Sequence, residues 1–452
     1  MRRSRSTVQT TLPVNAQKDR RMFNVENVRL AGADIELPRM IPIEQRFAAA
    51  AVEDLEAAIR DQVSEHDRAN PVAGKRIAIT AGSRGVARID RIVATLVDAL
   101  AGCGAKPFVV PAMGSHGGGT AEGQRQVLAE YGITEETVGA PVVSSMDTVV
   151  VAELPDGTPV HFDAEAAQAD GVVVLGRVKP HTDFRGTHES GLAKMIAIGL
   201  GKHRGATILH THGFEAFNRL IPAVAEAVLD VVPIEFGMAV VENAYEHVAR
   251  IELVPTEKLL AREAELLVEA KRLMPKLLVS DIDVLVVDEI GKDISGAGMD
   301  PNITGRAPVN ADKFKAVPIK RIVVLGLTEH TNGNACGLGM ADVTTQRCVD
   351  QIEFGSFYTN SLTSGVPDGA RIPMALANDR DAIIAALHMS RGTEDRPARV
   401  VRIRNTLSMP RIEVSEAYAQ EVADHPDMVA LGEPHDWDFD ATGTLPPLPA
   451  DH

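Results

Sequence analysis

The sequence predicts an α/β protein of two α/β domains, each with a mostly parallel sheet, and an active site in the interdomain cleft. The chain has 452 residues, which is more than a single compact core usually holds. Short β-rich runs alternate with glycine loops and helical patterns, as in sheets covered by helices. Hydrophobic residues make up 45% of the chain and aromatic residues only 4%. Aliphatic side chains must therefore fill the cores, which is typical of parallel sheets.

The repeating unit is clearest between residues 74 and 132. Residues 76–80 (RIAIT) predict a strand. A helix after it is predicted by the spacing of Ile89, Val93, Leu96 and Leu100. The run 107–112 (PFVVPA) predicts the next strand, and a glycine loop over 114–119 follows it, with Thr120 as a helix N-cap. Ligands of such sheets bind beyond the carboxyl ends of strands, so loops at these ends are candidate site segments.

A third strand, 170–178 (DGVVVLGRV), runs into the polar loop 179–194 (KPHTDFRGTHESGLAK). An amphipathic helix over 256–276 then ends the first domain, and the strands 281–290 and 320–327 belong to the second. We therefore expect three parts, namely a flexible N-terminal tail (1–25), an N-terminal catalytic and cofactor-binding α/β domain (26–275) and a C-terminal α/β domain that closes the cleft (276–452).

Charge and cysteine usage narrow the function classes. Lys and Arg number 46 against 62 Asp and Glu, giving a formal net charge of −16. This argues against nucleic acid or an anionic membrane as partner, because both select a basic face. The three cysteines are scattered without disulfide or zinc spacing, so we expect a cytoplasmic protein. No apolar run approaches the ~20 residues that a membrane helix needs.

Three of the predicted loops should meet at one edge of the first sheet. Each carries a polar group beside glycine: Arg84 in the first, His116 in the second, and His181, His188 and Lys194 in the third. Taken singly, each group has an ordinary interpretation as a surface residue or local hydrogen-bond partner. Their convergence is what favours a functional site, because histidines titrate near neutral pH and are the usual general acids and bases.

Common catalytic motifs do not account for these residues. The sequence has no Ser-His-Asp order, HExxH or paired-cysteine signature. The segment 199–205 (GLGKHRG) has glycines spaced as GxGxxxG, which differs from the dinucleotide-binding pattern. Two histidines on opposite sides of a substrate instead suit a reaction that works on both faces of one carbon.

These residues resemble the nickel-dependent lactate racemase family. The resemblance rests on Ser83-Arg84, on GSHGG (114–118), on KPH (179–181) followed by SGLAK (190–194), and on GATILHTHG (205–213). It implies that His116 and His181 are general acid/base catalysts and that Lys194 covalently carries a nickel-pincer nucleotide. It implies a nickel ligand at His210, with His212 as the alternative. It also implies cofactor or substrate contacts from Arg84, Ser83, Gly117 and Gly118.

The implied function is a racemase or epimerase that inverts C2 of a 2-hydroxy acid by reversible hydride transfer to the nickel-pincer nucleotide (Ni-pyridinium-3,5-bisthiocarboxylic acid mononucleotide). Its partners would be a small-molecule 2-hydroxy acid and the enzymes that build the cofactor. Two alternatives stay open: a metal-dependent hydroxy-acid lyase or dehydratase, and a non-catalytic nickel- or nucleotide-binding protein. The sequence does not define the oligomeric state.

The sequence also departs from that family's pattern. The spacing from His181 to Lys194 is longer than expected. In the second domain, residues 298–308 (GMDPNITGRAP) lack the family's Tyr-Gln and lysine. Basic and imidazole groups near these segments predict a substrate with a larger or second anionic group, and the candidate substrate residues are Lys179, Arg185, Arg306 and His330.

Overall fold

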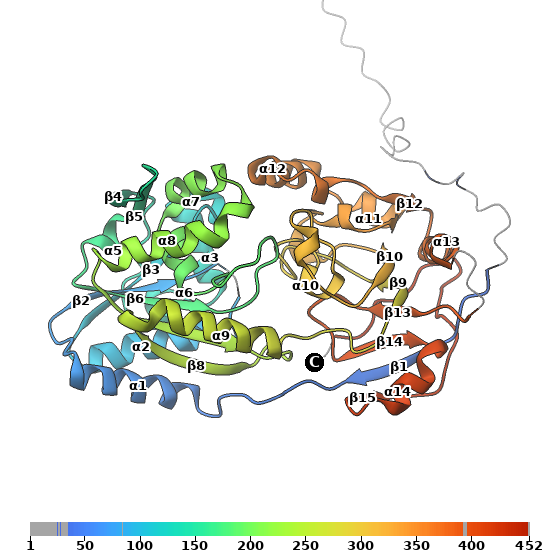
Figure 1. The fold of residues 1–452 in the computed structure, drawn as a ribbon, viewed down its shortest axis with the longest axis horizontal. Helices are drawn as coiled ribbons and strands as arrows, with labels where there is room; N and C mark the ends of the chain where they lie inside the picture. The colour runs from blue at the N-terminus through green and yellow to red at the C-terminus, as the bar shows by residue number, and fades with distance from the viewer. Residues whose placement is uncertain (1–24, 26–27, 29–34, 84, 392–395, 451–452) are drawn as a thin grey trace, which may run out of the picture.

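The computed structural model describes residues 25, 28, 35–83, 85–391 and 396–450, which form two lobes, each built on one large sheet (Figure 1). The mostly parallel α/β architecture predicted from the sequence is confirmed. The predicted tail over 1–25 lies, except for Val25, outside the described residues.

The first lobe contains a five-stranded sheet in the order β3-β2-β6-β7-β8. All neighbours are parallel except β7 and β8. Its strands are β2 (Arg76–Ala81), β3 (Lys106–Pro111), β6 (Gly171–Arg177), β7 (Ile234–Glu242) and β8 (Val248–Pro255). The central strand β6 is buried on both faces, as its sequence GVVVLGR requires, because helices cover both sides of the sheet.

Helices form a layer on each face of this sheet. One face packs on α1 (Leu55–Ala69), α2 (Ile89–Gly102), α3 (Ala121–Glu130) and α4 (Glu135–Val138). The other face packs on α6 (Leu192–Lys194), the π-helical turn η3 (Met195–Gly199), α7 (Lys202–Thr211), α8 (Phe217–Leu229) and α9 (Leu259–Leu273). The hairpin β4 (Thr148–Glu153) and β5 (Pro159–Asp163), followed by α5 (Ala164–Ala167), lies beside α7 and α8.

The second lobe contains an eight-stranded sheet in the order β12-β11-β10-β9-β13-β14-β1-β15. The strands from β12 to β13 are parallel, and the rest pair antiparallel. They are β9 (Ile282–Val287), β10 (Ile319–Val324), β11 (Val343–Thr345), β12 (Met374–Leu376), β13 (Val400–Ile403), β14 (Arg411–Ser415), β1 (Met40–Gln45) and β15 (Met428–Ala430). Its helices are α10 (Pro301–Thr304), α11 (Gln346–Asp350), α12 (Phe354–Ser364), α13 (Asp379–Arg391) and α14 (Ala419–Asp424).

Strand β1 departs from the predicted domain organisation. It lies within the segment 26–275 assigned to the first domain, yet it pairs with β14 and β15 in the sheet of the second lobe (Figure 1). The chain therefore crosses between the lobes twice, between β1 and α1 and again between α9 and β9. In this register Met40 pairs with Ser415 and Ile43 pairs with Ile412. Both side chains are thereby buried in the second lobe, which explains why β1 joins its sheet.

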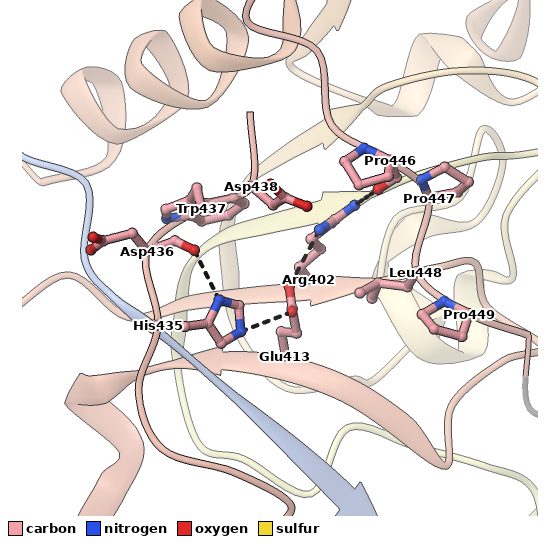
Figure 2. Close-up of a pocket in the computed structure, with 10 residues that line it drawn as sticks. All are labelled: Arg402, Glu413, His435, Asp436, Trp437, Asp438, Pro446, Pro447, Leu448 and Pro449. Atoms are coloured by element: carbon pink, nitrogen blue, oxygen red, sulfur yellow. Dashed lines mark hydrogen bonds and ion pairs between the residues drawn. The ribbon is translucent and has the colours of Figure 1, made fainter. Parts of the chain in front are cut away.

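The C-terminal segment after β15 forms a strap across the second lobe, with a cavity of about 680 Å³ beneath it (Figure 2). Within it, Arg402 is ion-paired with Asp288 and Glu413. The cavity is lined by Arg402, Glu413, His435, Asp436, Trp437, Asp438, Pro446, Pro447, Leu448 and Pro449. None of these residues belongs to the loops predicted to form the site. Among the described residues, no helix has the length and apolar composition needed to span a membrane.

Candidate functional site

The strand order brings the three candidate loops to one edge of the first sheet. Strand β2 lies between β3 and β6, and all three run parallel, so the loops after them start side by side. These loops carry Ser83 after β2, His116 after β3 and His181 after β6. Because neighbouring strands are spaced about 4.8 Å apart, the loops with the two histidines begin about 10 Å apart, on either side of Ser83. Arg84 lies outside the described residues.

The turn that carries His116 depends on glycine. Gly117, Gly118 and Gly119 all have φ near +65°, where a side chain is strained. A Cβ on Gly117 would lie 2.6 Å from the backbone nitrogen of Gln124, whereas a Cβ on Gly118 would meet nothing within 4 Å. Gly118 therefore borders open space, and a ligand in that space could approach the backbone closely.

Ser83 orients the exposed imidazole of His116. The Ser83 Oγ and the His116 Nδ1 form a short hydrogen bond. Ser83 is itself held in place, because the Tyr131 hydroxyl donates to its carbonyl at 2.8 Å. The β2 loop and the β3 loop are thus joined through these two side chains.

His181 and Lys194 form the closest pair of functional groups in the site. The Lys194 Nζ lies 2.6 Å from the His181 Nε2, and the Asp183 backbone N–H donates to the His181 Nδ1 at 3.0 Å. The ring also packs on Phe184, with centroids 4.4 Å apart. Because the Nδ1 accepts from the Asp183 N–H, the neutral ring carries its proton on Nε2, the nitrogen that faces Lys194.

A buried glutamate that the sequence analysis missed holds the His181 loop. Glu189 accepts from the His181 backbone N–H at 2.8 Å and from Arg185 at 3.1 Å, and it pairs with Lys271 at 2.7 Å. Its side chain is fully buried, so these charge-assisted contacts replace water. The only feature of the sequence that could have indicated this role is the presence of an acid within a basic, glycine-rich loop.

The second lobe contacts the same loop through Arg185. The guanidinium donates to the His181 carbonyl at 2.7 Å and to the Asn302 side chain, and it stacks on Phe314 at 4.0 Å. Asn310 adds a bond to the Asp183 carbonyl at 3.0 Å. In Figure 1 the loop extends from the first lobe toward α10. Arg185, predicted as a substrate ligand, is therefore engaged in joining the lobes.

A second buried acid, Glu263, supports the turn that carries Lys194. Its Oε2 accepts from the Ala193 N–H at 2.7 Å. A Cβ on Gly191 would lie 2.4 Å from its Oε1, so the glycine of SGLAK leaves room for this carboxyl. Burial raises the pKa of Glu263 to about 7. No pattern in the sequence indicated this contact, because Glu263 lies on α9 among residues of ordinary amphipathic spacing.

The two candidate nickel ligands, His210 and His212, have different surroundings. The His210 ring packs on Phe214 and Phe217, with centroids 5.3 and 5.0 Å away. This enclosure, and then the charge of Lys194, lower the pKa of His210, although the residue keeps an exposed surface. His212 is exposed at the C-terminal end of α7. Of the two histidines, His210 is the one whose ring packs on these phenylalanines.

The other three residues predicted to bind substrate, Lys179, Arg306 and His330, lie at different places in the structure. Lys179 and Ser190 pair through their backbones at 3.0 and 3.1 Å, which closes the base of the loop. Arg306 forms an ion pair with Asp342 at 2.6 Å inside the second lobe. His330 is exposed on the turn after β10. Across the described ranges, no three His, Cys, Asp or Glu side chains are grouped as a metal site.

Comparison with known proteins supports the resemblance seen in the sequence. Residues 37–219 match the lactate racemase N-terminal domain. The matched segment contains Ser83, His116, His181, Lys194 and His210. The resemblance to the lactate racemase family is thus confirmed over this part of the chain. A search of curated proteins gave no match.

Two solved structures match this chain at low similarity. A crystal structure of a Thermotoga maritima protein has a TM-score of 0.48 at 11% identity, covering 78% of this chain and 96% of its own. The lactate racemase apoprotein from Thermoanaerobacterium thermosaccharolyticum has a TM-score of 0.45 at 12% identity, covering 82% of this chain and 99% of its own.

Proposed function

Because residues 37–219 match the lactate racemase N-terminal domain, we propose that this chain is a cytoplasmic racemase or epimerase of 2-hydroxy acids that uses a nickel-pincer nucleotide. The observation that carries the proposal is the Lys194 amine 2.6 Å from the His181 imidazole, on the sheet edge that also presents His116. An enzyme of this class would depend on other enzymes to build the cofactor.

The residues around Lys194 fit such a group. With the His181 Nδ1 accepting from the Asp183 N–H, the neutral ring donates its Nε2–H to the Lys194 nitrogen, and an amine that accepts a hydrogen bond is uncharged and suited to covalent attachment. His210 offers one imidazole donor near Lys194, which suits a nickel ion whose other ligands come with the nucleotide. Gly118 provides a backbone approach open to a ligand. When bound, the cofactor would supply an electron-poor ring carbon that accepts and returns the hydrogen of C2.

The two histidines would move the substrate's hydroxyl proton from opposite sides. His116 lies on the loop after β3 and His181 on the loop after β6, so a substrate above β2 has one imidazole on each side. If Lys194 held the cofactor through an amide-type bond, its nitrogen would carry no charge and the His181 Nε2 would be available for proton exchange. Ser83 and Asp183 hold the two rings through their Nδ1 atoms. General acid–base help of this kind contributes about 10²–10⁴-fold.

The test combines mass and stereochemistry. The chain should be produced together with cofactor-building enzymes, and peptide mass spectrometry should find an adduct on Lys194. A chiral assay over a panel of 2-hydroxy acids should then show inversion with unchanged substrate mass. Lys106→Arg, at the opposite end of β3, is the matched control and should keep both adduct and activity. Loss of water from the substrate would favour a lyase instead, and full activity without an adduct would exclude the proposal.

A further inference from the structure

Lys202 is a buried lysine that the proposed chemistry does not use. Its side chain is fully buried, and its backbone has a φ of +52°, a conformation that non-glycine residues rarely adopt. Burial lowers the pKa of Lys202, while Asp163 opposes this shift. Burying a charge and straining the backbone both cost free energy. Such a residue therefore persists only where contacts with the surrounding structure stabilise it.

The contacts of Lys202 lead to the His116 turn. Its Nζ forms an ion pair with Asp163 of β5 at 2.8 Å and donates to the Pro111 carbonyl at 2.6 Å. Pro111 is the last residue of β3, directly before the segment that carries His116. The lysine therefore holds the start of this segment.

Gln124 holds the other part of the turn. Its side chain is fully buried, and its Nε2 donates to the carbonyls of Gly114 at 2.9 Å and His116 at 3.3 Å. Its Oε1 lies 3.5 Å from the Lys202 Nζ. An ammonium group can only donate, so it selects the oxygen side of the amide and directs the NH₂ toward the two carbonyls.

We propose that Lys202 is a positioning residue for His116, which acts through Pro111 and Gln124 while Asp163 compensates its charge. The inference rests on the proposed function only in taking His116 as an acid–base group. Gly199, the first glycine of GLGKHRG, packs against the same loop. A Cβ on Gly199 would lie 2.7 Å from the Ala112 carbonyl, so the close backbone approach here serves packing against the β3 loop.

The first experiment uses the protein without cofactor. Gln124→Ala removes both bonds to the turn, and amide exchange over residues 113–119 should rise about 25-fold, because each of the two bonds is worth about 1 kcal/mol, or about fivefold. The rate at which diethyl pyrocarbonate modifies His116 should rise with it. Exposed His388 on α13 is the internal reference. Gln126→Ala, which loses only a contact to Glu130, should change neither quantity.

The second experiment separates positioning from folding. Lys202→Met leaves the buried Asp163 carboxylate without its opposite charge, so the double variant Lys202→Met/Asp163→Asn is measured beside it. With cofactor-loaded protein, kcat should fall about 10–100-fold while KM stays within about twofold, as for a misplaced acid–base group. If the wild-type chain proves inactive, the proposed function fails but the exchange and modification data still decide this inference. An unchanged His116 modification rate and unchanged turn exchange in Gln124→Ala and the double variant would overturn it.

Discussion

The carboxyl group of Glu263 should make the stability of this protein depend on pH in a defined window. Burial raises its pKa to about 7 in the folded chain, against an ordinary value of 4.5. The folded state therefore binds more protons than the unfolded state between these values, so the free energy of unfolding falls as pH rises from about 4.5 to about 7. Above pH 7 the cost of the buried charge is present in full.

The size of the effect follows from the difference between the two pKa values. The pKa of about 7 in the folded chain exceeds the ordinary pKa of 4.5 by about 2.5. At 1.36 kcal/mol for each unit, Glu263 contributes a decline of about 3 kcal/mol across the window. Glu263→Gln keeps the shape and an oxygen for the Ala193 N–H but cannot ionise. The stability of this variant relative to wild type should therefore increase by about 3 kcal/mol from pH 4.5 to pH 7.5.

Urea unfolding followed by far-UV circular dichroism at half-unit steps of pH measures this difference. Glu257→Gln changes an exposed acid just before α9 and should give a curve parallel to that of the wild type. Curves for Glu263→Gln and wild type that stay parallel from pH 4.5 to 7.5 would refute the reasoning, because they would mean that Glu263 ionises normally in the fold.

Three further predictions concern the site. Gly191→Ala should lower the free energy of unfolding by about 1–3 kcal/mol in urea titrations, because its Cβ would lie 2.4 Å from Glu263; an unchanged midpoint would contradict this packing. Arg185→Lys keeps the charge but loses the planar stacking on Phe314, and limited proteolysis of the α9–β9 connection should become faster. His181→Gln should reduce racemisation by about 10²–10⁴-fold in the loaded enzyme, and near-wild-type turnover would remove it from catalysis.

Much of the site followed from local sequence because it depends on strand ends. The runs before Ser83, His116 and His181 are each recognisable as strands, and parallel neighbours must deliver their following loops to one edge. The glycines at 117–119 likewise indicate a turn that no other residue adopts easily. Local pattern did not distinguish a substrate-binding arginine from one that joins the lobes, since Arg185 lies in the same polar loop in either case.

The sequence by itself determined the α/β class, the loops that carry His116, His181 and Lys194, and the resemblance to the lactate racemase family. These depend on periodicity and on residues close together in the chain. Only the tertiary structure decided which residues from distant parts of the sequence contact and stabilise these loops. Glu263 meets Gly191 from another helix, and β1 joins the second sheet far from its sequence neighbours. Such pairings leave no local pattern, because burial and contact arise only when separate elements pack together.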